Sequence, residues 1–251
     1  MTRMLLTLLL LTSTIVCGQS AFAKAEQLYR AEQYDKAQAS FVKMYEQDSD
    51  DLKVIERLGD IAGHKKDFAT AMIYYKILLE NQPEDAHYNF KYGGAMGLYA
   101  KSCSKFQALS MLDDIKMYLK RAARLNPNHV ESRHALSQLY CELPGIVGGS
   151  IKKSRSYANE LLKLSPVDGH LAHGFIDEYE EDYDKALASY NKAVETGGSL
   201  VTYRKLAAVY QDKLKNYKKA LKILKRAQQK HQDQQLALDI AALETQILIS
   251  E

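Results

Sequence analysis

The chain has 251 residues, of which 46% are hydrophobic and 26% are charged, so its composition is that of a globular protein and wholesale disorder is excluded. Only four prolines and 13 glycines interrupt it, and Ala, Leu, Lys, Glu and Gln, which favour helix, dominate. The formal charge of +3 comes from Lys and Arg spread along the chain. Without a basic stripe, we expect no nucleic-acid partner.

The N-terminus predicts a cleaved signal peptide. Arg3 gives a basic start, and the apolar run at 4–16 is too short for a membrane-spanning helix, which needs about 20 apolar residues. We expect the signal peptide to cover 1–18, with cleavage after residue 23 as the alternative. The mature chain would then be periplasmic or secreted, with no transmembrane span.

A pattern with a period of 34 residues follows. An aromatic residue comes after a short polar turn, an alanine three positions later lets two helices approach, and a large residue four positions further continues an apolar stripe. Prolines then end the second helix of three units, because proline cannot continue it. The four copies are Tyr34-Ala37-Phe41, Phe68-Ala71-Tyr75, Tyr183-Ala186-Tyr190 and Tyr217-Ala220-Leu224, and the prolines are Pro83, Pro127 and Pro166.

The leading helices carry a matching pair. Leu58-Gly59 and Tyr92-Gly93 are again 34 residues apart, and Leu206-Ala207 occupies the same place. The small residue is expected where the first helix of a unit meets its neighbour.

With these residues the chain resembles the tetratricopeptide-repeat (TPR) family. The resemblance implies an all-α fold, a right-handed helical solenoid of about six helix-turn-helix repeats closed by a C-terminal capping helix. The solenoid would span 19–233 and the capping helix 234–251. The repeats would be 19–51, 52–85, 86–129, 130–166, 167–199 and 200–233.

Two units depart from the period. The spacing from Pro83 to Pro127 is 44, which places an insertion near 99–109 and predicts a longer helix after it. The next spacing is 39, and the excess falls in 143–149, where a proline and three glycines force a special turn. That segment lacks the lysine and hydroxyl residue of a phosphate-binding loop, so we expect no phosphate site there.

This layout also looks like that of exported bacterial repeat proteins. It is more distantly similar to the regulator of microtubule dynamics family, in which a long helix precedes an asparagine-proline turn, here Asn126-Pro127. That family includes a member implicated in lipid binding, so the resemblance leaves lipid open as a ligand.

Cys103 and Cys141 fall beside adjacent leading helices. An oxidising compartment would permit a disulfide between them if their Cα atoms lie within about 7 Å. Two buried thiols are the alternative.

No catalytic set is recognisable, so we expect no enzyme activity and no cofactor. His170, His173 and Asp177 share one face of a predicted helix. They could bind zinc, but a polar helix whose histidines form local hydrogen bonds is favoured. We therefore predict no metal site.

The inner face of a repeat array is lined by the leading helices and binds extended or helical segments. We predict a non-catalytic scaffold that binds a partner protein there; the alternative is a carrier of lipid or another small hydrophobic ligand, for which the groove should be deep and apolar. The candidate residues are Tyr29, Glu56, Asp60, His64, Phe90, Leu98, His134, Gln138, Phe175, Tyr179, Arg204 and Gln211.

Overall fold

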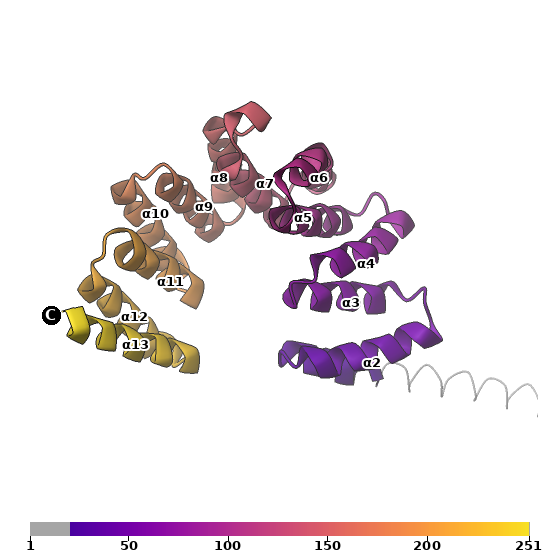
Figure 1. Ribbon diagram of the computed structural model, residues 1–251, viewed down its shortest axis with the longest axis horizontal. Helices are drawn as coiled ribbons and strands as arrows, with labels where there is room; N and C mark the ends of the chain where they lie inside the picture. The colour runs from indigo at the N-terminus through magenta and orange to yellow at the C-terminus, as the bar shows by residue number, and fades with distance from the viewer. Residues whose placement is uncertain (1–20, 251) are drawn as a thin grey trace, which may run out of the picture. The chain divides into compact units, whose positions relative to one another are not determined.

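A computed structural model of the protein describes residues 21–250 (Figure 1). The described residues form helices joined by short connections and contain no β-strand. The predicted all-α repeat architecture is confirmed. The predicted signal peptide at 1–18 lies outside the described residues, and in the described part no helix has the length and apolar character to cross a membrane.

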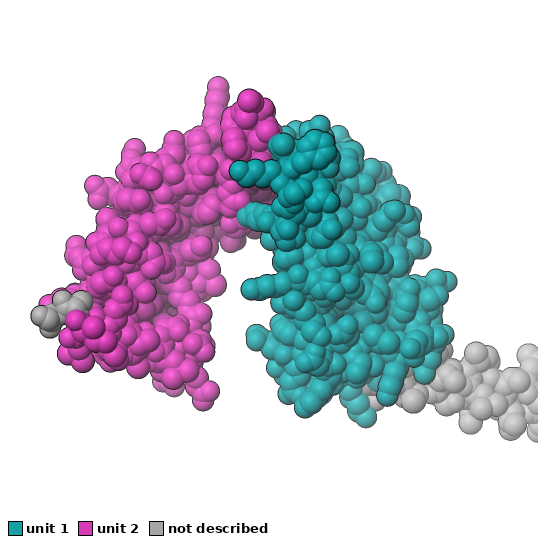
Figure 2. Space-filling view, viewed as in Figure 1, with its two compact units in different colours: residues 1–125 teal, residues 126–251 magenta. Residues whose placement is uncertain are grey.

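The chain divides into two compact units, with the boundary between Leu125 and Asn126 (Figure 2). The sequence predicted one continuous array and gave no sign of this division. The boundary falls just before Pro127, which follows the last residue of α6 by two positions.

Unit 1 begins with a helical segment at 21–30. Its other helices are α2 (Tyr34–Gln47), α3 (Leu52–His64), α4 (Phe68–Asn81), α5 (Ala86–Ser102) and α6 (Lys105–Leu125). Consecutive helices pack as antiparallel pairs, and each pair stacks on the next through its leading helix.

Unit 2 has the same plan. It contains α7 (Val130–Glu142), a 3-10 turn (Gly145–Val147), α8 (Ile151–Leu164), α9 (Pro166–Tyr179), α10 (Tyr183–Thr196), α11 (Leu200–Ala208) with a π-helical turn (Val209–Lys213), α12 (Tyr217–His231) and α13 (Gln234–Ser250). Pro166 does not lie in a loop but is the first residue of α9, where proline needs no amide hydrogen and its fixed φ suits a helix. From α13, Leu236, Ile240 and Leu243 complete the last apolar cluster of this unit.

An aromatic ring on a glycine closes two of the helix pairs. A Cβ added at Gly59 would lie 2.5 Å from the ring of Tyr75, and one at Gly174 would lie 2.5 Å from the ring of Tyr190. Tyr190 is fully buried and Tyr75 nearly so. Ring and glycine therefore bring the two helices of a pair to their closest approach. The predicted alanines behind them, at 37, 71, 186 and 220, are all fully buried as well.

Four of the turns between paired helices share one backbone feature that the sequence does not show. Glu32, Lys66, Glu181 and Lys215 have φ between 52° and 63°, and each precedes a predicted aromatic residue by two positions. In three of these turns, the residue that lies between the left-handed residue and the aromatic one is the N-cap of the second helix. Asp67, Asp182 and Asn216 each accept a hydrogen bond from the backbone amide three residues further on. A left-handed residue followed by a cap thus reverses the chain in three residues.

The two predicted irregularities are present. α5 has 17 residues and α6 has 21, against 13 and 14 in α3 and α4, so the insertion lengthens both helices. In the 143–149 turn, Gly148 has φ 91°, and a Cβ at Gly149 would lie 1.7 Å from the carbonyl oxygen of Leu143. Both glycines are therefore required by the backbone.

The ring-on-glycine contact makes a sharp prediction within one helix. We expect Gly59→Ala to lower the free energy of unfolding by about 1–3 kcal/mol, because the new methyl group must displace the Tyr75 ring. Gly63→Ala is the matched control: its Cβ would meet only the Tyr75 hydroxyl, at 3.8 Å. Urea unfolding of both variants checks this, and equal stability of the two would contradict the contact.

A second prediction concerns the turns. Replacing Lys66 by Gly is expected to raise stability by about 1 kcal/mol, because a side chain in the left-handed region costs about 1–2 kcal/mol and glycine avoids that cost. Lys66→Ala keeps the Cβ and should leave the thermal midpoint unchanged. A lower midpoint for the glycine variant than for the alanine variant would refute the explanation.

Candidate functional site

A network of opposite charges links the leading helices of unit 1. The guanidinium of Arg57 binds both carboxylate oxygens of Glu26, with Nε at 2.6 Å and Nη2 at 3.2 Å, and its Nη1 donates to Asp60 at 3.0 Å. Lys91 Nζ lies 2.5 Å from Asp60 and 2.7 Å from Glu56. Bidentate and shared pairs of this kind are stronger than isolated surface pairs. The network spans the segment 21–30, α3 and α5.

Glu56 is the most strongly perturbed carboxylate of the network. Hydrogen bonds from His87 and then from Lys91 outweigh desolvation and lower its pKa from 4.5 to about 2. Its side chain is 21% exposed, so the interaction is only partly screened by solvent.

The network is tied to the core through Tyr75. Its ring packs on Gly59, its hydroxyl donates to Asp60 at 2.8 Å, and Lys91 Nζ lies 5.4 Å from the ring centroid. Burial raises the pKa of the Tyr75 hydroxyl far above its usual range. The contact that closes the α3–α4 pair therefore also fixes the position of the Asp60 carboxylate.

Aromatic side chains form the outer end of this face. His64 stacks on Tyr34 with 4.7 Å between ring centroids, and its Nε2 lies 3.1 Å from the hydroxyl of Tyr29. Arg57 packs over the Tyr29 ring at 5.1 Å. Burial, with the nearby Asp60 charge, raises the pKa of Tyr29 to about 12. The Tyr29 hydroxyl thus stays a neutral hydrogen-bonding group near neutral pH.

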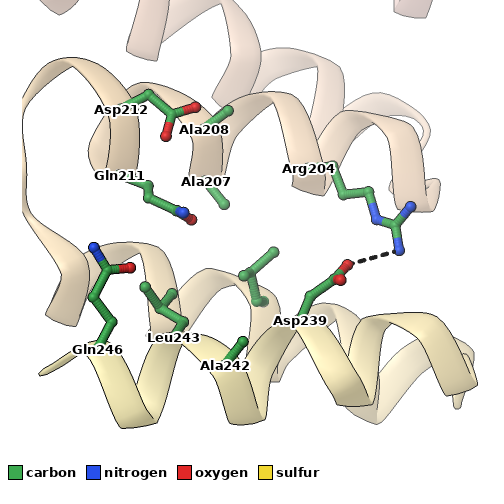
Figure 3. Close-up of a pocket in the computed structure, with 10 residues that line it drawn as sticks. Arg204, Ala207, Ala208, Gln211, Asp212, Asp239, Ala242, Leu243 and Gln246 are labelled. Atoms are coloured by element: carbon green, nitrogen blue, oxygen red, sulfur yellow. Dashed lines mark hydrogen bonds and ion pairs between the residues drawn. The ribbon is translucent and has the colours of Figure 1, made fainter. Parts of the chain in front are cut away.

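In unit 2 a pocket of about 360 Å³ lies between α11, with its π-helical turn, and α13 (Figure 3). Arg204 Nη2 binds Asp239 at 3.1 Å at one end, and the amides of Gln211 and Gln246 point toward the cavity at the other. Asp212 adds a carboxylate beside Gln211.

The floor of this pocket is apolar. Ala207 and Ala208 come from α11, Leu224 comes from α12, and Ala242 and Leu243 come from α13. At the place of Ala208, unit 1 has Asp60, whose larger side chain is held in the charge network. Ala208 therefore leaves space in unit 2 that a carboxylate occupies in unit 1. The π-helical turn brings in one extra residue beside the space, a feature common near functional sites.

The structure brings six of the predicted inner-face residues into these two places. Tyr29, Glu56, Asp60 and His64 belong to the network and its aromatic end, and Arg204 and Gln211 line the pocket. Their binding role stays a prediction.

The other predicted inner-face residues are scattered. Leu98 and Tyr179 are exposed, whereas Phe90, His134, Gln138 and Phe175 are half-buried. Desolvation lowers the pKa of His134, and Phe175 packs against the apolar cluster of α7, α8 and α9.

The zinc alternative finds no support. His173 Nε2 bonds to Asn159 at 3.0 Å, and the nearly buried Asp177 accepts from Arg155 at 2.8 Å. Within residues 21–250 no three histidine, cysteine or acidic side chains are grouped as metal ligands.

Cys103 and Cys141 are both free thiols in the structure, so the predicted disulfide between them finds no support. Cys103 caps the end of α5 in unit 1, and Cys141 lies in α7 of unit 2. Burial raises the pKa of the Cys141 thiol to about 11, which keeps it protonated and unreactive at neutral pH.

Sequence reasoning missed Glu26, Arg57 and Lys91, and it missed Asp239 and Gln246 of the pocket. A signal for them exists. Arg57 and Lys91 are 34 residues apart, as are Glu26 and Asp60. Arg204 and Asp239 are separated by 35, as are Gln211 and Gln246. The contacts themselves lie close to the repeat period: Arg57 binds Glu26 and Lys91 binds Asp60 across 31 residues, and Arg204 binds Asp239 across 35. A search for complementary side chains near that separation would have indicated these positions.

Solved TPR structures share this architecture. A thermophilic TPR protein from Thermus thermophilus aligns with a TM-score of 0.55 at 17% identity, over 90% of this chain and 98% of its own. A TPR protein from Parabacteroides merdae aligns with a TM-score of 0.57 at 13% identity, over 92% of this chain and 86% of its own. MamA aligns with a TM-score of 0.50 at 16% identity, over 69% of this chain and 94% of its own.

No protein-family model and no curated protein sequence matches the chain. At identities this low the structural likeness establishes the fold and nothing further. The chain has the tetratricopeptide-repeat fold that its sequence pattern indicates.

The Glu56 interactions predict how stability depends on pH. Because its pKa is lowered in the folded state, Glu56 adds stability that is complete above about pH 4.5 and is lost as the pH falls toward 2. Glu56→Gln should cost about 1–3 kcal/mol at pH 7 and flatten the loss of stability between pH 5 and pH 3.

The control is Glu80→Gln, which removes an exposed pair with Lys76 at 3.7 Å and should change stability by less than about 0.5 kcal/mol. The measurement is urea unfolding across this pH range. A parallel pH profile for Glu56→Gln and wild type would contradict the assignment.

Proposed function

We propose that the chain is a non-catalytic protein-interaction scaffold of an exported compartment, periplasmic or secreted, and that it binds a segment of a partner protein on its leading helices. The pocket between α11 and α13 is the observation that carries this proposal. It is open, it lies between the leading helix α11 and the C-terminal helix α13, and it offers hydrogen-bonding groups over an apolar floor of alanine and leucine.

The chemistry of the pocket suits a polypeptide. Gln211 and Gln246 can each donate to a main-chain carbonyl and accept from a main-chain amide, so together they can hold an extended or helical segment. The alanine floor admits a side chain of modest size. Arg204 and Asp239 pair with each other, and either can exchange that partner for an opposite charge on the segment.

A lipid or small-hydrophobic carrier is less well supported by the same pocket. Acyl chains require a deep apolar cavity, since burying unpaired polar groups against them is costly. Five of the ten lining residues are charged or carry carboxamides: Arg204, Gln211, Asp212, Asp239 and Gln246. The lining therefore favours a protein segment. The exported compartment rests on the N-terminal pattern of a basic residue, a short apolar run and small residues.

The test fills the pocket without removing a contact. Ala242 is exposed and lines the cavity, so Ala242→Phe should occupy the space and weaken partner binding about tenfold or more. The matched control is Ala39→Phe, which changes an equally exposed helical alanine in unit 1. Affinity for the partner recovered from the native cell envelope is measured by titration.

Equal affinity of the Ala242→Phe and wild-type chains would show that the pocket is not the binding site. Native mass spectrometry of the same preparation must show no retained lipid, because a bound lipid would favour the carrier. The location is tested by fractionation: a chain found only in the cytoplasm with residues 1–18 still attached would contradict export.

A further inference from the structure

The α5–α6 pair ends in a hairpin tip that the α3–α4 and α9–α10 pairs lack. Tyr75 lies against Gly59, 16 residues earlier, and Tyr190 lies against Gly174 at the same separation. In the α5–α6 pair a Cβ added at Gly93 would meet the Cβ of Tyr118 at 2.8 Å and the side chain of Leu119 at 3.5 Å. Leu119 takes the place of Tyr75 in the pattern and follows Gly93 by 26 residues, so ten extra residues lie on the turn side of the pair. They extend both helices past the point where α3 and α4 turn.

We define the hairpin tip as residues 98–110, which run from the end of α5 through the two-residue turn into the start of α6. Its turn is well formed. Ser102 Oγ donates to the carbonyl of Tyr99 at 2.7 Å, and the backbone amide of Gln107 donates to Ser104 Oγ at 3.4 Å. The tip is therefore an ordered helical projection rather than a loose loop.

Large apolar side chains of this projection are exposed to solvent. Phe106 is 83% exposed, and Leu109 and Leu98 are about half exposed. In the α3–α4 pair the turn is instead made of Lys65, Lys66 and Asp67. Three exposed apolar side chains gathered at one end of a helix pair form a candidate contact surface for an external partner.

The charge of the tip points to the kind of partner. Residues 98–110 contain Lys101 and Lys105 and no aspartate or glutamate, in a chain with 31 acidic residues. Both lysines are exposed and flank the turn that carries Phe106. Apolar side chains next to lysines match the interface of a membrane that contains anionic lipids: the rings and aliphatic groups enter the headgroup region and the ammonium groups pair with phosphates. The nearest acids, Asp113 and Asp114, follow the tip by about one turn of α6.

We propose that the hairpin tip of α5 and α6 is a membrane-docking element that inserts Phe106 and Leu109 into an anionic lipid surface. The shape of the element favours this over a protein partner. A convex tip requires a preformed pocket on a protein, whereas a lipid headgroup layer adapts to it. Docking through the tip leaves the pocket between α11 and α13 to its own ligand, so this inference does not depend on the proposed function.

The protein contains no tryptophan, so one introduced at the tip reports on its surroundings alone. Phe106→Trp is expected to shift its fluorescence to the blue when vesicles of phosphatidylglycerol and phosphatidylcholine are added to the full chain. Vesicles of phosphatidylcholine alone should cause little shift. The matched control is Ile73→Trp, at a residue of α4 that is 63% exposed but lies outside the tip; it should not respond to either vesicle.

A second variant separates charge from insertion. Adding Lys101→Gln and Lys105→Gln to Phe106→Trp should raise the lipid concentration needed for half of the shift about tenfold or more, and added salt should raise it for the unmodified tip as well. Circular dichroism checks that the helices persist. An absent shift, an equal shift with neutral vesicles, or an equal shift at Ile73 would each overturn the proposal. Crosslinking of the tip to a protein without vesicle binding would overturn it in favour of a protein partner.

Discussion

The contact between an aromatic ring of the second helix and a glycine of the first sets the geometry of the helix pairs. Tyr75 on Gly59 and Tyr190 on Gly174 allow the two helices to approach closely at one point, and buried alanines fill the space behind the ring. A larger residue in place of the glycine would push the helices apart, and a smaller one in place of the ring would leave a cavity. The side chains of α3 and α9 are positioned relative to these two points.

The same rings connect the core to the surface chemistry. The hydroxyl of each tyrosine donates a hydrogen bond to an acidic residue of the leading helix: Tyr75 to Asp60, and Tyr190 to Glu178. In unit 1 that acid is shared with Arg57 and Lys91, so one core contact orients a charge network across three helices. In unit 2 Ala208 takes the place of Asp60, and a pocket lies there between α11 and α13. Fold and candidate site are consequences of the same packing.

Much of the fold could be read from the sequence because its determinants are spaced at a fixed period. Rings, glycines and alanines at 34-residue intervals can face each other only in stacked helix pairs, and the wider proline spacing predicted the insertion and the longer α6 after it, although not the lengthening of α5. The glycines at 148 and 149 also predicted the turn in which they lie. By contrast, Lys66 and Glu181 take the left-handed conformation without any glycine to mark it, and their turns could not be predicted from residue type.

The candidate site was predictable only in part. Tyr29, Asp60 and His64 were assigned to the inner face by register, but their partners were not, because a charged side chain has many rotamers and its partner depends on how neighbouring helices stack. The pocket in unit 2 is a missing volume, and no residue pattern shows one until the helices are placed. The exposure of Phe106 likewise follows from the length of a hairpin and not from its own residue type.

A double-mutant cycle between Gly59→Ala and Tyr75→Leu is the most direct measurement of the central contact. If the ring and the glycine fix the helix pair, leucine removes the ring atoms that the new methyl group would strike. Most of the cost of Gly59→Ala should then vanish in the Tyr75→Leu background, with a coupling of about 1 kcal/mol or more. Additive costs would mean that ring and glycine do not determine each other's position, and the packing described here would be wrong.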